Sequence, residues 1–154
     1  MIQLKNEIVI NESKEKVFAF LAEMENIPLW NYHVKQVKNI KSNRAKKSKF
    51  LQIRKSDSQH FEIHKFLYPH LLVIRTVGNS KIKFKRSFYV KADHSGNCTL
   101  EDNFEIDLGY PQLIHKLFKS TMKKEVGINL GKLKELLEKG FTVLQNGRVS
   151  RLTS

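Results

Sequence analysis

Residues 81–108 read KIKFKRSFYVKADHSGNCTLEDNFEIDL, two alternating segments separated by a run of turn-forming residues. On each side of residues 92–96, apolar residues take every second position and polar residues take most positions between them. This period of two is typical of half-buried antiparallel strands with one face in water. The stretch therefore predicts a hairpin whose apolar face must be covered by another part of the chain.

A turn at residues 92–96 would determine which residues face each other across this hairpin. The predicted inward pairs are Val90 with Cys98, Phe88 with Leu100, Phe84 with Phe104 and Ile82 with Ile106. The predicted outward pairs of opposite charge are Lys83 with Glu105 and Lys81 with Asp107. Opposite charges directly across two strands stabilise a sheet, so both faces agree with this register.

One inward pair, Arg86 opposite Asp102, breaks the apolar pattern. A guanidinium in an apolar cavity can hold a ligand carboxylate, phosphate or enolate oxygen, and a carboxylate can orient it or move a proton. The alternatives are a structural ion pair across the strands, or a shifted register that places both charges outside. Because a buried ion pair rarely adds much net stability, its presence points to a candidate functional site.

The composition indicates an ordinary globular domain. The chain has 154 residues, of which 40% are hydrophobic and 28% are charged. We expect a single domain over residues 1–140. Residues 141–154 form a basic tail in which Asn146-Gly147 is a hairpin signal; a frayed tail, or pairing with a neighbouring molecule, are the alternatives.

The remaining elements follow from periodicity and from residues that begin or end helices. Strands are expected over residues 2–10, 32–40, 49–55, 60–67 and 71–77, in addition to the hairpin. A short helix begins after the N-cap Ser13 and is stopped or divided at Asn26-Ile27-Pro28. An apolar stripe of helical spacing predicts one helix over residues 112–139, about 42 Å long, that ends at Gly140.

The predicted fold class is α+β, a curved antiparallel sheet of about seven strands wrapped around the long C-terminal helix. One or two short helices lie between strands 1 and 2. Only the last helix is long enough to cover the sheet, and a sheet that curls around it leaves a concave apolar space. Gly127 and Gly131, one turn apart in that helix, indicate a close backbone approach, space left open, or a simple bend.

Four segments carry a resemblance to a known family. They are VFAFL at residues 17–21, NIPLWNYHV at 26–34, FLYPHLL at 66–72 and LGKLK at 130–134. Together with the element order, they resemble the START-type helix-grip superfamily (SRPBCC), in its polyketide cyclase/dehydrase and lipid-transport branch. The resemblance covers residues 2–139. It implies a cavity between sheet and helix that takes lipids, sterols, polyketides or plant hormones; other members bind quinones, act on ribosomes, or are cyclases or dehydratases.

The expected function is therefore binding or carriage of a small hydrophobic or amphipathic ligand, such as a lipid, a polyketide or a quinone-like molecule. The expected ligand-binding residues are Arg86, Asp102, Phe84, Phe88, Leu100, Phe104, Trp30, Met122 and Val126. Arg86 would anchor a polar headgroup and Asp102 would neutralise it in the empty cavity. The alternative from another class is a cyclase or dehydratase in which Arg86 and Asp102 act on a carbonyl substrate.

No cofactor and no metal are predicted. His60, Glu62 and His64 share one face of a strand, but the two histidines lie about 13 Å apart, too far to hold one ion. Phe61, Ile63 and Leu67 occupy the inward positions of the same strand, so the polar face is expected to be solvated.

Two further residues are considered for the cavity. The turn at residues 78–80 leaves open whether Arg75 faces it. Cys98 is expected to be an inert buried thiol.

The net charge of +13 is concentrated in the middle of the chain. Residues 32–91 carry sixteen Lys or Arg against two acids. The simpler interpretation is a lysine-coated sheet exterior; the alternative is an interaction module that uses residues 35–55 on a ribosome or an anionic membrane. No specific nucleic-acid binding is predicted, because no aromatic residues interleave with the Lys and Arg residues.

The chain is predicted to be cytoplasmic. This prediction follows from its single cysteine and from the lack of a signal peptide and of a transmembrane segment.

Overall fold

The computed structural model describes residues 1–40, 48–80, 82–109 and 112–153. Its elements, in chain order, are β1 (Ile2–Ile10), α1 (Lys14–Ala22), the 3-10 helix η1 (Met24–Asn26), α2 (Ile27–Trp30), β2 (Val34–Asn39), β3 (Lys49–Arg54), β4 (Ser58–Leu67), β5 (Leu71–Thr76), β6 (Lys83–Ala92), β7 (Cys98–Asp107), α3 (Gln112–Lys139), β8 (Phe141–Val143) and β9 (Val149–Arg151). The predicted element order and the bounds of the long helix are confirmed. Most strand ends differ by one or two residues, and the second strand begins at Val34 rather than at residue 32.

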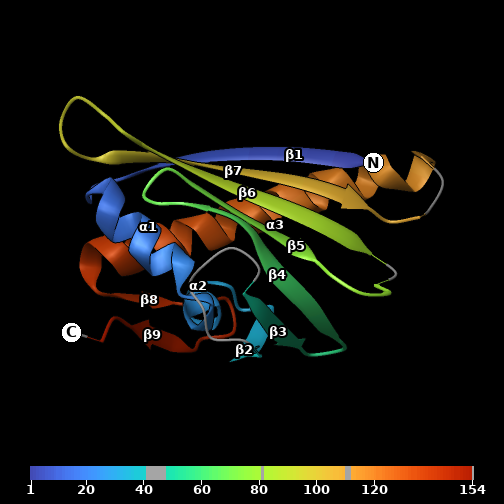
Figure 1. Cartoon of the computed structure of the whole chain (residues 1–154). Helices are drawn as coiled ribbons and strands as arrows, with labels where there is room; N and C mark the ends of the chain where they lie inside the picture. The colour runs from blue at the N-terminus through green and yellow to red at the C-terminus, as the bar shows by residue number, and fades with distance from the viewer. Residues whose placement is uncertain (41–47, 81, 110–111, 154) are drawn as a thin grey trace.

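Seven antiparallel strands form one sheet in the order β1-β7-β6-β5-β4-β3-β2, and α3 runs along it (Figure 1). The second half of α3 supplies Val126, Leu130, Leu133 and Leu137 to the hydrophobic core, where they join inward-facing residues of the sheet. The predicted α+β architecture, a sheet that grips one long C-terminal helix, is confirmed. None of the helices in the described residues has the length and hydrophobicity needed to span a lipid bilayer.

The hairpin of β6 and β7 has the predicted faces but a register shifted by two residues. Val90 lies opposite Leu100 and Phe84 lies opposite Ile106, where Cys98 and Phe104 were predicted. On the outer face Lys83 faces Asp107 and Lys85 faces Glu105; Lys81 lies outside the described residues.

The cause of the shift is the loop between the two strands. The Asp93 amide donates to the Asn97 carbonyl at 2.8 Å, and Gly96 takes a left-handed φ of 85°. Asp93 Oδ1 also accepts hydrogen bonds from the Ser95 hydroxyl and from the amides of Ser95 and Asn97. The bond from the Ser95 hydroxyl is the main reason that the pKa of Asp93 lies below its usual value. The loop is therefore centred on Ser95 rather than on His94, which moves every cross-strand partner by two positions.

The short helices between β1 and β2 arise from capping and from proline. The Ser13 hydroxyl accepts a hydrogen bond from the Lys16 amide at 3.2 Å, which confirms the predicted N-cap. Near Asn26 the chain passes through η1 into α2, whose first turn contains Pro28. The segment is thus divided rather than stopped, and Trp30 at the end of α2 is buried in the core.

A β-bulge in β4 changes which residues face inward. The register between β4 and β5 shifts between Ile63 and Lys65, so the alternation reverses beyond that point. Phe66 packs against Phe18 with ring centroids 5.3 Å apart, whereas Leu67 is 56% exposed. The expectation that Leu67 faces inward is wrong, because a period-two pattern does not reveal an inserted residue.

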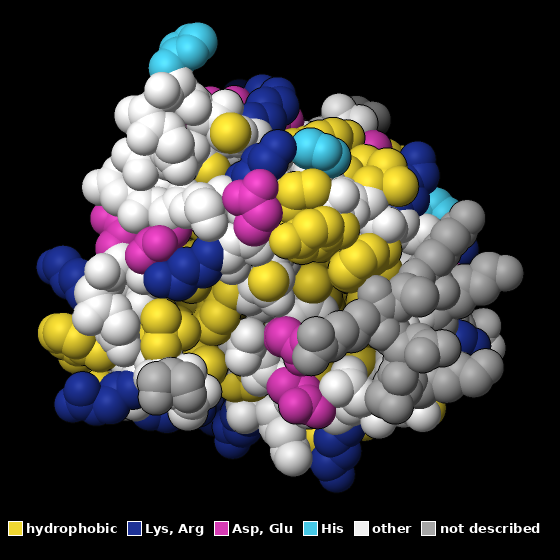
Figure 2. Space-filling view, turned by 60° about the vertical axis from the view of Figure 1, so that its left-hand side comes forward, with side chains coloured by type: hydrophobic (Ala, Val, Ile, Leu, Met, Phe, Trp, Pro, Cys, Tyr) yellow, Lys and Arg dark blue, Asp and Glu magenta, His cyan; other side chains and the backbone are white. Residues whose placement is uncertain are grey.

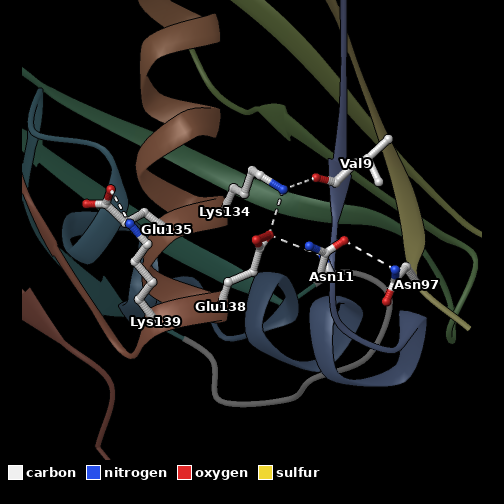
Figure 3. Close-up of polar contacts among 7 residues, drawn as sticks. All are labelled: Val9, Asn11, Asn97, Lys134, Glu135, Glu138 and Lys139. Atoms are coloured by element: carbon white, nitrogen blue, oxygen red, sulfur yellow. Dashed lines mark hydrogen bonds and ion pairs between the residues drawn. The ribbon is translucent and has the colours of Figure 1, made fainter.

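The C-terminal half of α3 is held to the end of β1 by a polar network (Figure 3). Lys134 Nζ donates to the Val9 carbonyl and to Glu138 Oε2, both at 2.6 Å. Glu138 Oε2 also accepts from the Asn11 amide at 3.2 Å, and the Asn11 side chain accepts from Asn97 Nδ2. These bonds connect α3, β1 and the loop between β6 and β7 at one end of the molecule.

Residues 141–151 form the hairpin that the sequence offered as one of three alternatives, with β8 paired to β9. Arg148 Nη2 donates to the Pro28 carbonyl at 2.5 Å, and Gln145 Nε2 donates to Asn129 Oδ1 at 3.1 Å. The tail is therefore fixed to both α2 and α3. Figure 2 shows that hydrophobic side chains gather on the face brought forward in that view, among charged ones.

Candidate functional site

A cavity of about 390 Å³ lies between the sheet and α3. Residues from β2, β3, β4, β5, β6, β7 and α3 line it, together with the segment that joins α2 to β2 and the loop between β3 and β4. Its apolar wall includes Phe61, Ile74, Phe84, Phe104, Met122 and Val126. A volume of roughly 300–1,000 Å³ with mostly apolar walls and a few polar groups is typical of small-molecule sites.

Arg86 and Asp102 form a bidentate ion pair on the inward face of the sheet. Arg86 Nε donates to Asp102 Oδ1 at 2.9 Å, and Nη2 donates to Oδ2 at 2.6 Å. The Asp102 side chain is fully buried and the Arg86 side chain is 11% exposed. The prediction that both side chains face the interior is confirmed, although the two residues are diagonal neighbours rather than directly opposite each other.

Aromatic rings surround the Arg86 guanidinium. Its central carbon lies 4.3 Å from the ring centroid of Phe104, 4.6 Å from that of Phe88 and 5.3 Å from that of Trp30. Each ring face attracts a cation, and this attraction is larger where water is excluded. The rings therefore hold the guanidinium in one orientation, at the wall of the cavity.

The nine predicted ligand-binding residues separate into two layers. Those that line the cavity are Arg86, Phe84, Phe104, Met122 and Val126. The other four, Asp102, Phe88, Leu100 and Trp30, do not line it and are at most 3% exposed. Within this second layer, Asp102, Phe88 and Trp30 contact Arg86, so they are positioned to support the cavity wall rather than to touch a ligand.

Three amide side chains in the cavity wall were missed by the sequence analysis. Gln52 on β3 and Gln59 on β4 lie directly opposite each other, and Asn129 comes from α3. All three are less than 9% exposed. Gln59 was missed because the predicted strand began at residue 60. In the structure β4 begins at Ser58, so Gln59 faces inward like Phe61 and Ile63.

His33 and Glu125 form a polar contact in the cavity wall. His33 Nε2 lies 3.4 Å from Glu125 Oε2, and both side chains are about one-third exposed. The contact joins the segment after α2 to α3. No acidic partner could be assigned to His33 from the sequence, because His33 and Glu125 are ninety-two positions apart.

The first turns of α3 are exposed, in contrast to its second half. Ile114, Leu117 and Phe118 are 51%, 79% and 37% exposed. Phe118 and the neighbouring Thr121 also line the cavity. One side of the cavity is therefore closed by a helical segment that has few buried side chains of its own.

The other polar residues singled out from the sequence lie away from the cavity. His60, Glu62 and His64 are on the outer face of β4, and Arg75 Nε donates to Glu62 Oε1 at 2.7 Å, which places Arg75 outside as well. Cys98 is buried, and this burial raises the pKa of its thiol to about 11. The basic stretch at 35–55 is an exception, because its Arg54 lines the cavity; residues 41–47 of this stretch lie outside the described residues.

A family model described as polyketide cyclase / dehydrase and lipid transport matches residues 1–138 of the chain. No curated protein matches the chain in sequence. Several solved structures share the fold. The protein TTHA0849 from Thermus thermophilus is 12% identical with a TM-score of 0.74, over 88% of this chain and 97% of that one.

Two further structures of similar fold have more informative descriptions. A START superfamily protein from Mycobacterium smegmatis is 14% identical with a TM-score of 0.70, over 88% of this chain and 98% of that one. The di-domain ARO/CYC protein BexL, from the BE-7585A biosynthetic pathway, is 11% identical with a TM-score of 0.67, over 88% of this chain and 47% of that one. At these identities the likeness shows the fold alone.

Proposed function

This chain belongs to the polyketide cyclase/dehydrase and lipid transport family, and on that premise we propose that its cavity binds a small hydrophobic or amphipathic ligand. Arg86 is proposed to hold an electron-rich oxygen of that ligand. The observation that carries the proposal is a guanidinium at the wall of an apolar cavity, with its charge offset by a buried carboxylate.

The hydrogen bonds of Arg86 leave donors for a ligand. A guanidinium has five N–H donors, and Asp102 accepts from Nε and from Nη2. Among the described residues no other group accepts a hydrogen bond from Arg86. Nη1 and the second hydrogen of Nη2 are therefore available to a ligand oxygen.

The chemistry of the cavity favours an acid or a polarised carbonyl over a hydrocarbon. Asp102 neutralises Arg86 in the empty cavity, so the site needs no counter-ion when it is unoccupied. A ligand oxygen would gain charge-assisted hydrogen bonds, while its apolar body would replace water along Phe61, Phe84 and Phe104. A volume of about 390 Å³ favours a ligand of modest size, such as a medium-chain fatty acid.

The experiment is titration calorimetry with dodecanoic acid and with 1-dodecanol as the neutral analogue. The binding variant is the double substitution Arg86→Met with Asp102→Leu, because removing Arg86 alone would leave Asp102 buried without a partner. The matched control is Lys83→Met, an exposed position of the same strand. We expect the double variant to bind dodecanoic acid at least tenfold more weakly and to bind dodecanol unchanged. Equal affinity of the wild type and the double variant for the acid would reject Arg86 as the anchor.

His33 and Glu125 favour a second candidate, an enzyme that moves a proton on a carbonyl substrate held by Arg86. A histidine next to a carboxylate is a common general acid or base, and both residues line the same cavity as Arg86. Turnover of a poly-β-ketone substrate that is lost in His33→Gln, with ligand affinity retained, would support this candidate. Binding without any turnover would leave carriage as the function.

A further inference from the structure

The first turns of α3 expose a cluster of apolar side chains to water. Ile114, Leu117 and Phe118 are 51%, 79% and 37% exposed, and Leu117 is the most exposed large hydrophobic side chain among the described residues. With Thr121 they follow the spacing i, i+3, i+4 and i+7, so they share one face of the helix. A cluster of exposed apolar side chains, unlike a single one, indicates an interaction site.

The same segment is strongly basic. From Ile114 to Lys124 the chain has no acidic residue and four exposed lysines, which are Lys116, Lys119, Lys123 and Lys124. Among the described residues, the ion pairs that lysines of α3 form are those of Lys134 and Lys139, near the other end of the helix. The positive charge of the first turns is therefore not offset by an ion pair with any described residue.

The apolar side chains and most of the lysines occupy different faces of α3. Lys116, Lys119 and Lys123 are spaced i, i+3 and i+7, on the side of the helix opposite to the apolar cluster. An apolar face combined with a lysine-rich face is typical of helices that lie in the plane of a membrane surface. In such helices the apolar side chains enter the lipid, and the lysines are attracted to anionic headgroups.

A lipid surface fits these residues better than a second copy of the chain or an RNA. In a two-fold dimer the same patch would face itself, which would bring the unpaired lysines of both copies together. Single-stranded RNA stacks its bases on aromatic rings, and Ile114 and Leu117 offer no such ring.

The cavity reaches the protein surface at this segment. Phe118 and Thr121 line the cavity and are also exposed. Arg54 and Asp57, from the end of β3 and the loop after it, line the cavity too. They pair with each other, with Arg54 Nε 3.6 Å from Asp57 Oδ1, and so add little net charge. A bilayer in contact with the first turns of α3 would therefore lie next to the cavity.

We infer that the first turns of α3 dock the protein on an anionic lipid surface. Leu117 and its apolar neighbours enter the boundary between headgroups and acyl chains, and the four lysines contact the headgroups. Docking would let an apolar ligand pass between the bilayer and the cavity without crossing water. This inference goes beyond the proposed function and does not depend on it, because the surface would bind lipid whether or not the cavity is occupied.

The experiment measures co-sedimentation of the full chain with two kinds of vesicle, phosphatidylcholine alone and equal parts of phosphatidylcholine and phosphatidylglycerol. We expect the wild type to bind the anionic vesicles about tenfold more tightly than the neutral ones, and added salt to weaken this binding. Leu117→Gln, and the double variant Lys116→Gln with Lys119→Gln, should each bind the anionic vesicles about tenfold more weakly than the wild type.

The matched controls make the same substitutions at exposed positions of other elements. Leu67→Gln changes an exposed leucine in β4, and Lys35→Gln with Lys38→Gln removes two exposed lysines of β2. Both controls should bind the anionic vesicles like the wild type. Equal loss of binding in the controls would mean that the net charge of the whole protein, rather than the start of α3, binds the vesicles, and the inference would fail.

A second measurement reports directly on insertion. Leu117→Cys labelled with acrylodan should emit at shorter wavelength when anionic vesicles are added, because the dye moves from water into lipid. The same label on Leu67→Cys should not shift. Cys98 is buried and its thiol is protonated, so it does not compete for the label in the native protein.

Two further results would overturn the inference. Unshifted emission from the label at position 117 on bound protein would mean that the lysines attract polyanions, such as RNA, without the apolar cluster entering lipid. A dimer in the absence of vesicles that Leu117→Gln converts to a monomer would mean that a second copy covers this surface. Binding of dodecanoic acid in solution without vesicle binding would reject the docking alone, and vesicle binding without binding of the acid would reject the proposed function alone.

Discussion

Arg86 and Asp102 make two hydrogen bonds, at 2.9 and 2.6 Å, although neither residue lies directly opposite the other. Arg86 faces Phe104 across the strands, and Asp102 faces Phe88. Diagonal neighbours on one face of a sheet are about 7–8 Å apart at Cα, within reach of a long side chain. The contact therefore depends on both residues being on the inward face more than on their register.

The first prediction concerns the stability of this pair. Asp102→Ala leaves the guanidinium buried without its counter-charge, so we expect the free energy of unfolding to fall by about 3–5 kcal/mol. The double variant Arg86→Met with Asp102→Leu replaces both charges by apolar side chains and should be about as stable as the wild type. Urea unfolding of the three proteins is the measurement. A double variant as unstable as Asp102→Ala would show that the pair itself stabilises the fold.

The second prediction concerns the two glycines inside α3. A Cβ atom at Gly127 would lie 3.7 Å from Asn6 Oδ1, an ordinary contact, and one at Gly131 would meet nothing within 4 Å. The close backbone approach considered from the sequence is therefore absent at both positions. Each Gly→Ala substitution should raise the free energy of unfolding by about 1 kcal/mol, as in any helix interior.

Gly140 provides the contrast for this prediction, because it ends α3 with a φ of 84°. A side chain in this left-handed region is unfavourable, so Gly140→Ala should lower the free energy of unfolding by about 1–2 kcal/mol. Thermal unfolding followed by circular dichroism would compare the three variants. Loss of stability in Gly131→Ala would mean that the helix needs flexibility at that point.

The third prediction is a pH dependence at Glu138. Burial raises the pKa of this carboxyl, but the Lys134 ammonium and the Asn11 amide outweigh it, so the pKa lies below the usual 4.5. A depressed folded-state pKa stabilises the fold above the unfolded value and loses that effect as the pH falls through the folded value. Glu138→Gln should therefore be less stable than the wild type at pH 7, by about 1 kcal/mol.

The same comparison at low pH is the check on this interpretation. As the pH falls through the depressed folded-state pKa, the wild-type carboxyl becomes protonated, and the difference in stability between wild type and Glu138→Gln should shrink. Chemical unfolding at several pH values between 3 and 7 measures it. A difference that stays constant over this range would mean that the charge of Glu138 contributes nothing.

The fourth prediction concerns Cys98. Its thiol is buried and has a pKa of about 11, mainly because burial disfavours the thiolate and secondarily because of the charge of Asp93. At pH 8 only about one thiol in a thousand would be ionised. The native protein should not react with a disulfide reagent such as DTNB, whereas the protein in guanidinium should react within minutes. A fast reaction of the native protein would show that the β6 and β7 strands open near their loop.

The sequence was sufficient for the fold because alternation and helical spacing persist over long segments. The inward face of β6 and β7, the N-cap at Ser13 and the end of α3 at Gly140 all follow from local rules. The register of the hairpin was wrong by two residues. Periodicity specifies a face but not a partner, and here the partner was set by Asp93 and Gly96 in the loop.

Less of the candidate site than of the fold could be predicted from the sequence. Arg86 was found because a charge interrupts a clear apolar pattern. Gln59 was missed because the predicted strand began one residue after it, and Gln52 was missed because the short strand around it shows no clear alternation. The contact between His33 and Glu125 joins residues far apart in the chain. Which predicted residues line the cavity and which support it depends on how closely α3 approaches the sheet, and no local pattern encodes that distance.

The asymmetric attachment of α3 has a consequence for motion. Lys134 and Glu138 fasten its C-terminal part to β1, whereas the turns around Leu117 have no comparable bonds among the described residues and keep their apolar side chains in water. Amide hydrogen exchange should therefore be fast at the start of the helix and slow beyond Val126. Local fraying of those first turns would widen the opening of the cavity while the sheet stays intact. A guest molecule could then enter or leave more easily without any rearrangement of the strands.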